Sequence, residues 1–438
     1  MSKQLKTAGI YTLGCKVNQY ESQAISEELT RNGFRVISPA CVCDAYIINT
    51  CTVTAESDRK ARQFIRRAIG KSSNAIIIVT GCMAQSAPRA VAEIEGVDAI
   101  IGNTQKLLCA KVANTLVSEG QKRTSPLMLV ESMENADFEK MSITEFERTR
   151  AYVKIEDGCE SKCTYCIIPS ARGKIRSKPM AEVIDEVTEL TRNGCREIVL
   201  TGIETASYGK ERKDEDLVKL LEQVDMIDGI GRVRLGSLDP SFIKPDVVKR
   251  LAGVKCLAPH FHLSLQSGSS RILALMKRKY NAEQAMRAIE LLREHIPSVK
   301  LTTDIIVGFP DESEEDFEQT AEFLKKAKFL SAHIFPYSKR QDTPAASMPS
   351  QISKEEKSRR VHALTQVQEQ IRMEILREEL ETQPIKQVLF EAWRDGFATG
   401  HTADFLEVSA PTVRPLHAVT ASVRVTSYNA NGLLGEII

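Results

Sequence analysis

The sequence has few aromatic side chains, almost no net charge and no long apolar stretch. Aromatic residues make up 5% of its 438 residues, a low content that argues against an extended base-stacking surface of the kind single-strand nucleic-acid binders use. The net charge of +1 excludes a globally basic nucleic-acid-binding protein, so attraction to RNA must come from local patches. No run approaches the ~18 apolar residues of a membrane span, and no apolar signal segment opens the chain. We expect a cytoplasmic protein of about three domains.

Short β-branched runs alternate with amphipathic stretches in the first part of the chain. The runs are "AGIYTLG" (8–14), "AYIINT" (45–50), "AIIIVTG" (75–81) and "AIIG" (99–102). Such alternation predicts an open parallel sheet with helices on both faces. We assign it to an N-terminal domain over residues 1–118, followed by a charged, irregular linker over 119–145.

A second alternating series and a change of pattern define the rest. Six strand-like runs begin at residues 151, 197, 232, 260, 301 and 331, with helical patterns between them. Six βα units predict an incomplete barrel of parallel strands, assigned to residues 146–375. After a long helix over 353–381, four short strand-like runs predict a small all-β barrel over 376–438. The fold class is therefore α/β with a terminal β-barrel.

Three of the eleven cysteines lie close together in "DGCESKCTYC". Disulfides are rare in the cytoplasm, so clustered cysteines there indicate metal ligation or catalysis. Cys159, Cys163 and Cys166 have the spacing CxxxCxxC and no fourth ligand nearby. Structural zinc needs four protein ligands. Three thiolates on a four-iron cluster would instead leave one iron free to bind a small molecule.

Three other cysteines each follow a predicted strand. Cys15, Cys51 and Cys82 come after "IYTLG", "YIINT" and "IIVTG". The carboxyl ends of parallel strands face one crevice, so the three thiols are expected to converge as a second ligand set. The alternative is burial in the core, where cysteine behaves as a small apolar residue. We expect that alternative for the cysteines without such placement, which are Cys41, Cys43, Cys109, Cys195 and Cys256.

The CxxxCxxC motif, with Tyr165 before its last cysteine, resembles the radical S-adenosylmethionine superfamily. Within it, the chain resembles the methylthiotransferases from end to end. "TLGCKVNQYES", "NTCTVT" and "VTGCMAQ" match the family's N-terminal domain, and "CIIPSARGKIRSKP", "LSLQSGSSRIL" and "TDIIVGFPDESEEDF" its radical domain. "LFEAWRDGFATGHTADFLEV" resembles the TRAM domain, a small RNA-binding β-barrel.

Three branches of that family differ in substrate. "GCKVNQYE" and "NTCTVT" resemble the branch that modifies N6-threonylcarbamoyladenosine in tRNA next to the anticodon. The alternatives are the branch for N6-isopentenyladenosine in tRNA and the branch for an aspartate of a ribosomal protein. A metal-dependent RNA-binding module without turnover is a further alternative. The chain departs from the family pattern at Lys162, Glu204–Ser207 and Asp311, which concern substrate or cofactor contacts, because every ligand cysteine is retained.

The resemblance implies two [4Fe–4S] clusters, an auxiliary one on Cys15, Cys51 and Cys82 and a radical one on Cys159, Cys163 and Cys166. It also implies two uses of S-adenosylmethionine, which supplies a methyl group and a radical that removes hydrogen from carbon 2 of adenine. Such barrels bind their ligands at the carboxyl ends of the strands. The expected contacts to S-adenosylmethionine are therefore Tyr165, Gly202, Ile203, Ser264, Gln266, Asp304 and Gly308, with Arg278 a weaker candidate.

Two basic segments are candidates for tRNA contact. Residues 59–71 carry six basic and no acidic residues, and residues 170–178 carry four and none. Such patches suit phosphate binding, although a solvated helix face is the competing interpretation. The region 384–438 has four basic and five acidic residues, so its RNA role rests on the resemblance alone.

Overall fold

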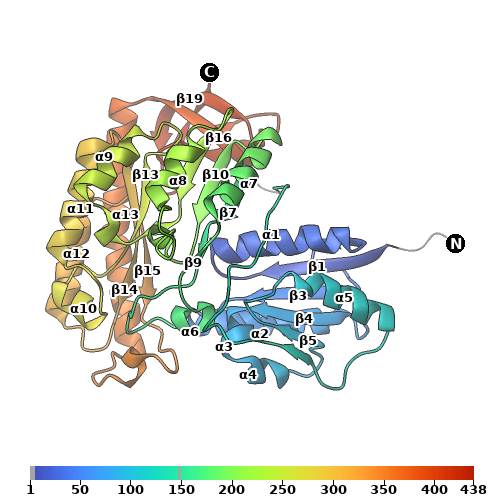
Figure 1. Cartoon of the computed structure of the whole chain (residues 1–438). Coiled ribbons are helices and arrows are strands. Elements are labelled where there is room, and N and C mark those ends of the chain that lie inside the picture. The colour runs from blue at the N-terminus through green and yellow to red at the C-terminus, as the bar shows by residue number, and fades with distance from the viewer. Residues whose placement is uncertain (1–4, 147–148) are drawn as a thin grey trace.

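The computed structural model describes residues 5–146 and 149–438. It consists of an open parallel sheet, an incomplete parallel barrel and a small closed β-barrel, in that order along the chain (Figure 1). No helix in the described part of the chain has both the length and the apolar character needed to cross a bilayer. The α/β class with a terminal β-barrel is confirmed.

The N-terminal sheet has six parallel strands in the order β2-β1-β3-β4-β5-β6. Its strands are β1 (Lys6–Thr12), β2 (Phe34–Ile37), β3 (Ala45–Thr50), β4 (Ile76–Gly81), β5 (Ala99–Ile101) and β6 (Leu127–Leu129). The prediction missed β2, and β6 lies in the stretch predicted to be irregular. Both are short strands at the edges of the sheet, where each pairs with a single neighbour, β2 with β1 and β6 with β5. Neither has a long apolar run that would have marked it in the sequence.

Helices cover both faces of this sheet, as predicted. One face packs against α1 (Lys16–Arg31) and α5 (Leu108–Glu119), and the other against α2 (Ala55–Ile69). The short helices α3 (Cys82–Ser86) and α4 (Pro88–Ala92) follow β4. The buried residues of α2 recur at helical spacing, Ala61, Ile65 and Ala68, so the basic side chains between them point toward solvent.

The central barrel has six parallel strand positions and is open between its first and last strands, as predicted. Its strands are β7 (Arg150–Lys154), β10 (Glu197–Thr201), β11 (Arg232–Leu235) continued by β12 (Ser237–Leu238), β13 (His260–Gln266), β14 (Lys300–Val307) and β15 (Ser331–Pro336). The pair β8 (Glu156–Asp157) and β9 (Arg176–Ser177) lies beyond the end of β7. Its helices are α6 (Ile168–Arg172), α7 (Met180–Arg192), α8 (Leu217–Val224), α9 (Pro245–Gly253), α10 (Ser270–Leu275), α11 (Ala282–His295) and α12 (Glu314–Ala327).

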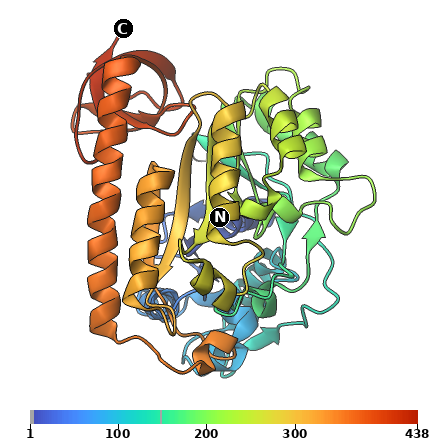
Figure 2. The same ribbon diagram turned by 90° about the vertical axis from the view of Figure 1, so that its left-hand side faces the viewer.

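A long helix, α13 (Lys354–Thr382), runs beside α12 and carries the terminal barrel at its end (Figure 2). That barrel closes in the order β16-β17-β18-β20-β19. Its strands are β16 (Ile385–Arg394), β17 (Phe397–His401), β18 (Glu407–Pro411), β19 (Thr420–Tyr428) and β20 (Leu433–Ile437). The sequence pattern predicted the first four of these strands and missed β20.

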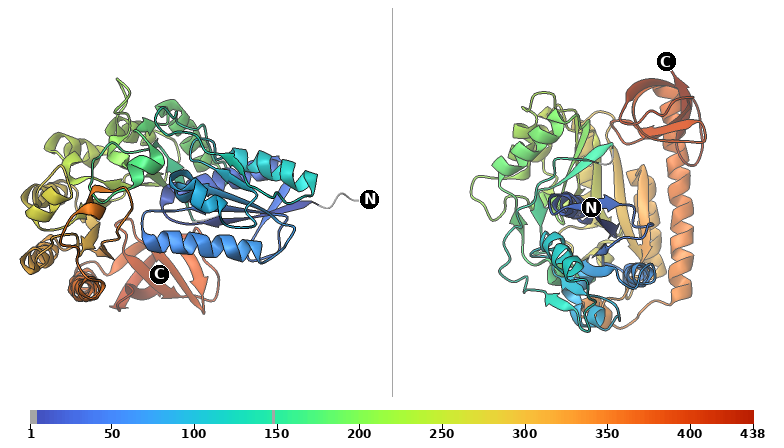
Figure 3. Two further views of the ribbon diagram at one scale, coloured as in Figure 1. Left: turned by 90° about the horizontal axis from the view of Figure 1, so that it is seen from below. Right: turned by 90° about the vertical axis from the view of Figure 1, so that its right-hand side faces the viewer.

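The N-terminal sheet lies beside the barrel (Figure 1 and Figure 3), and a buried ion network joins the two. Its centre is Glu21 of α1, whose carboxylate contacts Lys106, Lys154 of β7 at 3.0 Å and Arg172 of α6 at 2.6 Å. All four side chains are essentially inaccessible to solvent. Burial alone would raise the pKa of Glu21, but Arg172, Lys106 and Lys154 hold that pKa well below its usual range.

The same network corrects the prediction of an RNA-binding patch at residues 170–178. Arg172 and Arg176 both pair with Asp157, and Lys178 pairs with Glu186 at 2.5 Å. These three cations are buried, so they neutralise internal carboxylates and do not face an RNA backbone. The sequence could not reveal this, because the acidic partners come from other elements.

We expect Glu21→Gln to destabilise the protein strongly, because it leaves Lys106, Lys154 and Arg172 buried with less compensating charge. Removing one partner of a buried ion group costs about 3–5 kcal/mol, which urea denaturation would measure. The matched control is Glu28→Gln on the same helix, which removes the solvent-accessible pair with Arg31 and should cost no more than about 1 kcal/mol. Equal, small effects of the two substitutions would contradict the central role of Glu21.

Candidate active site

A cavity of about 310 Å³ lies at the carboxyl ends of the barrel strands. Three cysteines, Cys159, Cys163 and Cys166, line one side of it. The N-terminal domain also contributes, through Val53 and Thr54, two and three residues after Cys51. The other lining residues include Tyr165, Ile203, Glu204, Asp239, Ser264, Gln266, Arg278, Asp304, Ile306 and Phe335.

Cys159, Cys163 and Cys166 lie on the loop between β8 and α6. Burial raises the pKa of Cys159 to about 12, with the Glu204 carboxylate adding to the effect, and burial raises the pKa of Cys166 to about 11. Cysteine binds metals as the thiolate, so metal binding here must displace protons from the thiols. The loop is anchored at Thr164, whose backbone N–H donates to Met276 O.

Five of the seven predicted cofactor contacts line the cavity, namely Tyr165, Ile203, Ser264, Gln266 and Asp304. Gln266 has a φ of 74°, a left-handed conformation that non-glycine residues adopt rarely and that occurs preferentially at functional sites.

Gly202 and Gly308 lie outside this lining. A Cβ on Gly202 would approach Glu156 Oε2 to 2.4 Å, and the Gly308 N–H donates to Glu312 Oε2 at 2.6 Å. Both glycines thus lie against carboxylates beside the cavity, and their contact with S-adenosylmethionine stays a prediction.

Arg278 holds the cysteine loop against the barrel. Its guanidinium donates to Cys163 Sγ at 3.2 Å, to Asp239 Oδ2 at 2.8 Å and to Ser264 O at 3.0 Å. The side chain is only 9% exposed, whereas its basic neighbours in sequence suggested a solvated surface. Asp239, which the sequence pattern did not single out, also lines the cavity. Glu204, one of the departures from the family pattern, lines it too and accepts from Cys159 Sγ at 3.2 Å.

Cys15, Cys51 and Cys82 lie at the carboxyl ends of β1, β3 and β4. Gly14 touches the Cys51 side chain so closely that an added Cβ would lie 2.9 Å from the Cys51 sulfur. Cys82 Sγ accepts from Arg172 Nε at 3.3 Å. Burial raises the pKa of Cys51 to about 11. The adjoining strands thus bring the three cysteines to one edge of the sheet, the edge that faces the barrel.

The chemistry of the two cysteine sets fits iron–sulfur clusters, because thiolates are the usual ligands of such clusters. In an iron–sulfur cluster each thiolate binds a different iron, so the sulfurs stand farther apart than the ligands of one ion. Arginine N–H groups on Cys82 and Cys163 would stabilise negative sulfur at both sites. The donor set therefore fits two [4Fe–4S] clusters.

The remaining cysteines are mostly core residues, as predicted. Cys43, Cys109, Cys195 and Cys256 are buried. Cys41 is exposed, so the prediction of burial is wrong for that residue. It lies in a turn after β2 rather than in a strand.

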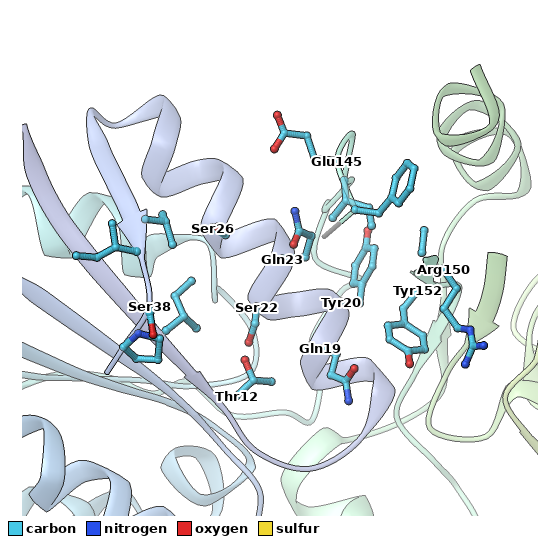
Figure 4. A pocket seen from close by; sticks show the side chains of 17 residues that line it. Thr12, Gln19, Tyr20, Ser22, Gln23, Ser26, Ser38, Glu145, Arg150 and Tyr152 are labelled. Atoms are coloured by element: carbon cyan, nitrogen blue, oxygen red, sulfur yellow. The ribbon is translucent and has the colours of Figure 1, made fainter. Parts of the chain in front are cut away.

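A second cavity of about 330 Å³ lies between α1 and the start of β7 (Figure 4). Its labelled side chains include Gln19, Ser22, Gln23 and Arg150 (Figure 4). None of its lining residues is a cysteine or a histidine. It is therefore a cavity between the two domains and not a candidate site for an iron–sulfur cluster.

The fold and the three-cysteine loop define a radical S-adenosylmethionine enzyme. Residues 153–324 match the model of the radical SAM superfamily, and residues 7–102 match the uncharacterized protein family UPF0004. The fold resembles that of the radical S-adenosylmethionine methyltransferase TsrM from Kitasatospora setae, with a TM-score of 0.57 and 15% identity over 78% of this chain and 74% of that one.

Curated relatives identify the family. The chain is 38% identical to the threonylcarbamoyladenosine tRNA methylthiotransferase MtaB of Bacillus subtilis over 92% of this chain and 90% of the relative. It is 35% identical to the MtaB of Chlamydia pneumoniae over 99% and 98%. It is also 35% identical to the tRNA-2-methylthio-N(6)-dimethylallyladenosine synthase of Methylacidiphilum infernorum over 83% and 80%. The chain belongs to the tRNA methylthiotransferase family of radical S-adenosylmethionine enzymes, which use S-adenosylmethionine and [4Fe–4S] clusters.

We expect Cys159→Ala, Cys163→Ala and Cys166→Ala each to abolish reductive cleavage of S-adenosylmethionine, because a cluster with a free iron cannot assemble on two thiolates. Formation of 5′-deoxyadenosine by the reconstituted protein measures this. Cys41→Ala, at an exposed cysteine outside both sets, is the matched control and should behave as wild type. Cleavage retained in any of the three variants would contradict the assignment.

Replacing Cys15, Cys51 and Cys82 together by Ala should remove only the other cluster. The variant should bind about four irons instead of about eight and still form 5′-deoxyadenosine, but it should yield no methylthio product. Iron analysis and product chromatography measure the two effects. If these cysteines were only core residues, the folded variant would keep the iron content of wild type.

Proposed function

We propose that the chain converts N6-threonylcarbamoyladenosine, next to the anticodon in tRNA, to its 2-methylthio derivative. The single observation that carries this proposal is one cavity lined both by Cys159, Cys163 and Cys166 and by Val53 and Thr54 of the N-terminal domain, which lie just after Cys51. The B. subtilis and C. pneumoniae relatives carry this activity in their names. A tRNA substrate agrees with a cytoplasmic location.

We assign the sulfur chemistry to the two cysteine sets. Cys159, Cys163 and Cys166 would hold the cluster that binds S-adenosylmethionine, and Cys15, Cys51 and Cys82 the auxiliary cluster. When bound, S-adenosylmethionine would supply the methyl group and the radical that removes hydrogen from carbon 2 of adenine, and the clusters would pass on an electron and hold the sulfur that is methylated. The electron and the sulfur come from a separate reductant and a separate sulfur donor. Carbon 2 is neither acidic nor electrophilic, so side chains alone cannot functionalise it.

The side chains around the cavity bind and orient S-adenosylmethionine. Ser264, Gln266 and Asp304 offer polar groups for the amino acid and ribose parts of S-adenosylmethionine. Ile203, Ile306 and Phe335 form apolar walls that exclude water from a reactive radical. Tyr165 lies on the cysteine loop itself.

Contact with tRNA is assigned to two surfaces. The basic residues of α2 include Arg59, Lys60, Arg66 and Arg67, all of them exposed, and phosphate contacts need accessible cations. The terminal β-barrel exposes Trp393 and Phe397, aromatic side chains on which bases can stack. We also propose the domain boundaries: an N-terminal domain over residues 1–118, a linker over 119–145, the radical S-adenosylmethionine core over 146–375 and the TRAM domain over 376–438.

The test is a competition between two RNAs in vitro. Stem-loops that differ only in carrying N6-threonylcarbamoyladenosine or N6-isopentenyladenosine are offered together to the enzyme with both clusters. We expect methylthiolation of the threonylcarbamoyl RNA, detected as a mass increase of the nucleoside. Exclusive modification of the isopentenyl RNA would refute the proposed substrate, but the chain would still belong to the methylthiotransferase family.

A further inference from the structure

Four of the seven histidines line one cavity at the amino ends of the barrel strands. They are His260 and His262 of β13, His333 of β15 and His401 of β17. The cavity has a volume of about 260 Å³. Pockets for drug-sized molecules measure ~300–1,000 Å³, so this one suits a nucleoside side chain rather than a whole nucleotide.

All three parts of the chain meet at this cavity. The terminal barrel closes it with His401 and Phe405, whose rings stack at 4.7 Å. The N-terminal domain contributes Lys16, the residue after Cys15, and the long helix α13 contributes Arg372. A group in this cavity would therefore lie close to the chain segment that carries Cys15.

The histidine cavity adjoins the active-site cavity across one hydrogen bond. Alternate residues of a strand face the same side, so His260 and His262 line the same interior as Ser264 does nearer the carboxyl ends. Asp304 lines the active-site cavity, and His262 Nε2 donates to its Oδ2 atom at 3.2 Å. A substrate could thus place its base in one cavity and a substituent in the other.

A chain of hydrogen bonds in this cavity ends at His260, whose Nδ1 atom has no hydrogen-bond partner within the described residues. We assign to His262 the tautomer that donates from Nε2 to Asp304. Its Nδ1 then accepts from Thr302 Oγ1 at 3.0 Å, and that hydroxyl accepts from His260 Nε2 at 3.1 Å. Burial, with Arg234 and Lys16 nearby, lowers the pKa of His260 well below its usual range, so the ring is neutral. Its Nδ1 is then a buried acceptor, and it has no partner among the described residues.

The cavity also has two lining cations, Lys16 and Arg372, and one lining acid, Glu407. Two further carboxylates, Asp304 and Glu391, pair with the lining histidines His262 and His401. Arg372 Nε is buried and, within the described part of the chain, has no hydrogen-bond partner. An isopentenyl group would leave these polar atoms unpaired, at a cost for each, whereas a carboxylate would form charge-assisted hydrogen bonds with them. The described residues hold no metal-ion site that would use the histidines instead.

We propose that this cavity receives the N6 side chain of the substrate nucleoside and selects for its carboxylate. Lys16 and Arg372 bind the carboxylate, and His260 Nδ1 accepts from a hydroxyl or N–H of the same side chain. This inference rests on the proposed function, because a threonylcarbamoyl group carries a carboxylate, a hydroxyl and urea N–H groups. It adds the residues that distinguish this substrate from an apolar one.

The test compares two stem-loop RNAs that differ only in the side chain's end, one with the threonylcarbamoyl carboxylate and one with the corresponding carboxamide. The full chain with both clusters is used, and kcat/KM for methylthiolation is measured for each RNA. Wild type should prefer the carboxylate by about 10- to 100-fold, the range for one charge-assisted hydrogen bond. Arg372→Gln and Lys16→Gln should each reduce this preference, and Arg372→Lys should retain part of it.

Arg377→Gln is the matched control, because Arg377 is exposed on the same helix and should keep the wild-type preference. The ratio of the two rates is insensitive to partial damage of the clusters or the fold, since such damage lowers both rates together. A wild-type enzyme that treats both RNAs alike, or Arg372→Gln and Lys16→Gln variants that lose rate equally on both, would overturn the inference while the proposed function stands. A wild-type enzyme that modifies only isopentenyl RNA would overturn the proposed function itself.

Discussion

The buried carboxylate of Glu21 is the contact on which the arrangement of the two domains depends. It lies on a helix of the N-terminal domain, and two of its cationic partners, Lys154 and Arg172, belong to the barrel. Charges out of water are costly unless each has a partner in good geometry. The two domains must therefore dock in the register that pairs all of these groups. Apolar surface alone would allow the sheets to slide relative to one another.

This register brings Val53 and Thr54, from the segment after Cys51, to the cavity that Cys159, Cys163 and Cys166 line. Arg172 contacts Glu21 through its two terminal nitrogens and the Cys82 sulfur through Nε, so the ion network and the auxiliary cysteines share a side chain. Asp157, which also contacts Arg172, lies two residues before Cys159. The chain thus links both cysteine sets to one rigid, water-free group. Chemistry that passes a methylthio group from one site to a base held at the other needs such fixed geometry.

The sequence was informative where one segment determines its own structure, and uninformative where distant segments determine it together. Buried parallel strands read as continuous apolar runs, so most strands and the cysteines at their ends could be predicted. Arg172 could not be assigned, because its partners Glu21 and Asp157 lie elsewhere in the chain. The histidine cavity was missed for the same reason, since His262, His333 and His401 come from three different strands. Short edge strands such as β6 owe their conformation to pairing.

The most direct test of the account is nucleoside mass spectrometry of tRNA from a strain that lacks this gene. We expect the 2-methylthio derivative of N6-threonylcarbamoyladenosine to disappear, its unmethylthiolated precursor to accumulate, and the wild-type gene to restore the product. Persistence of that derivative, together with loss of the 2-methylthio derivative of N6-isopentenyladenosine, would contradict it.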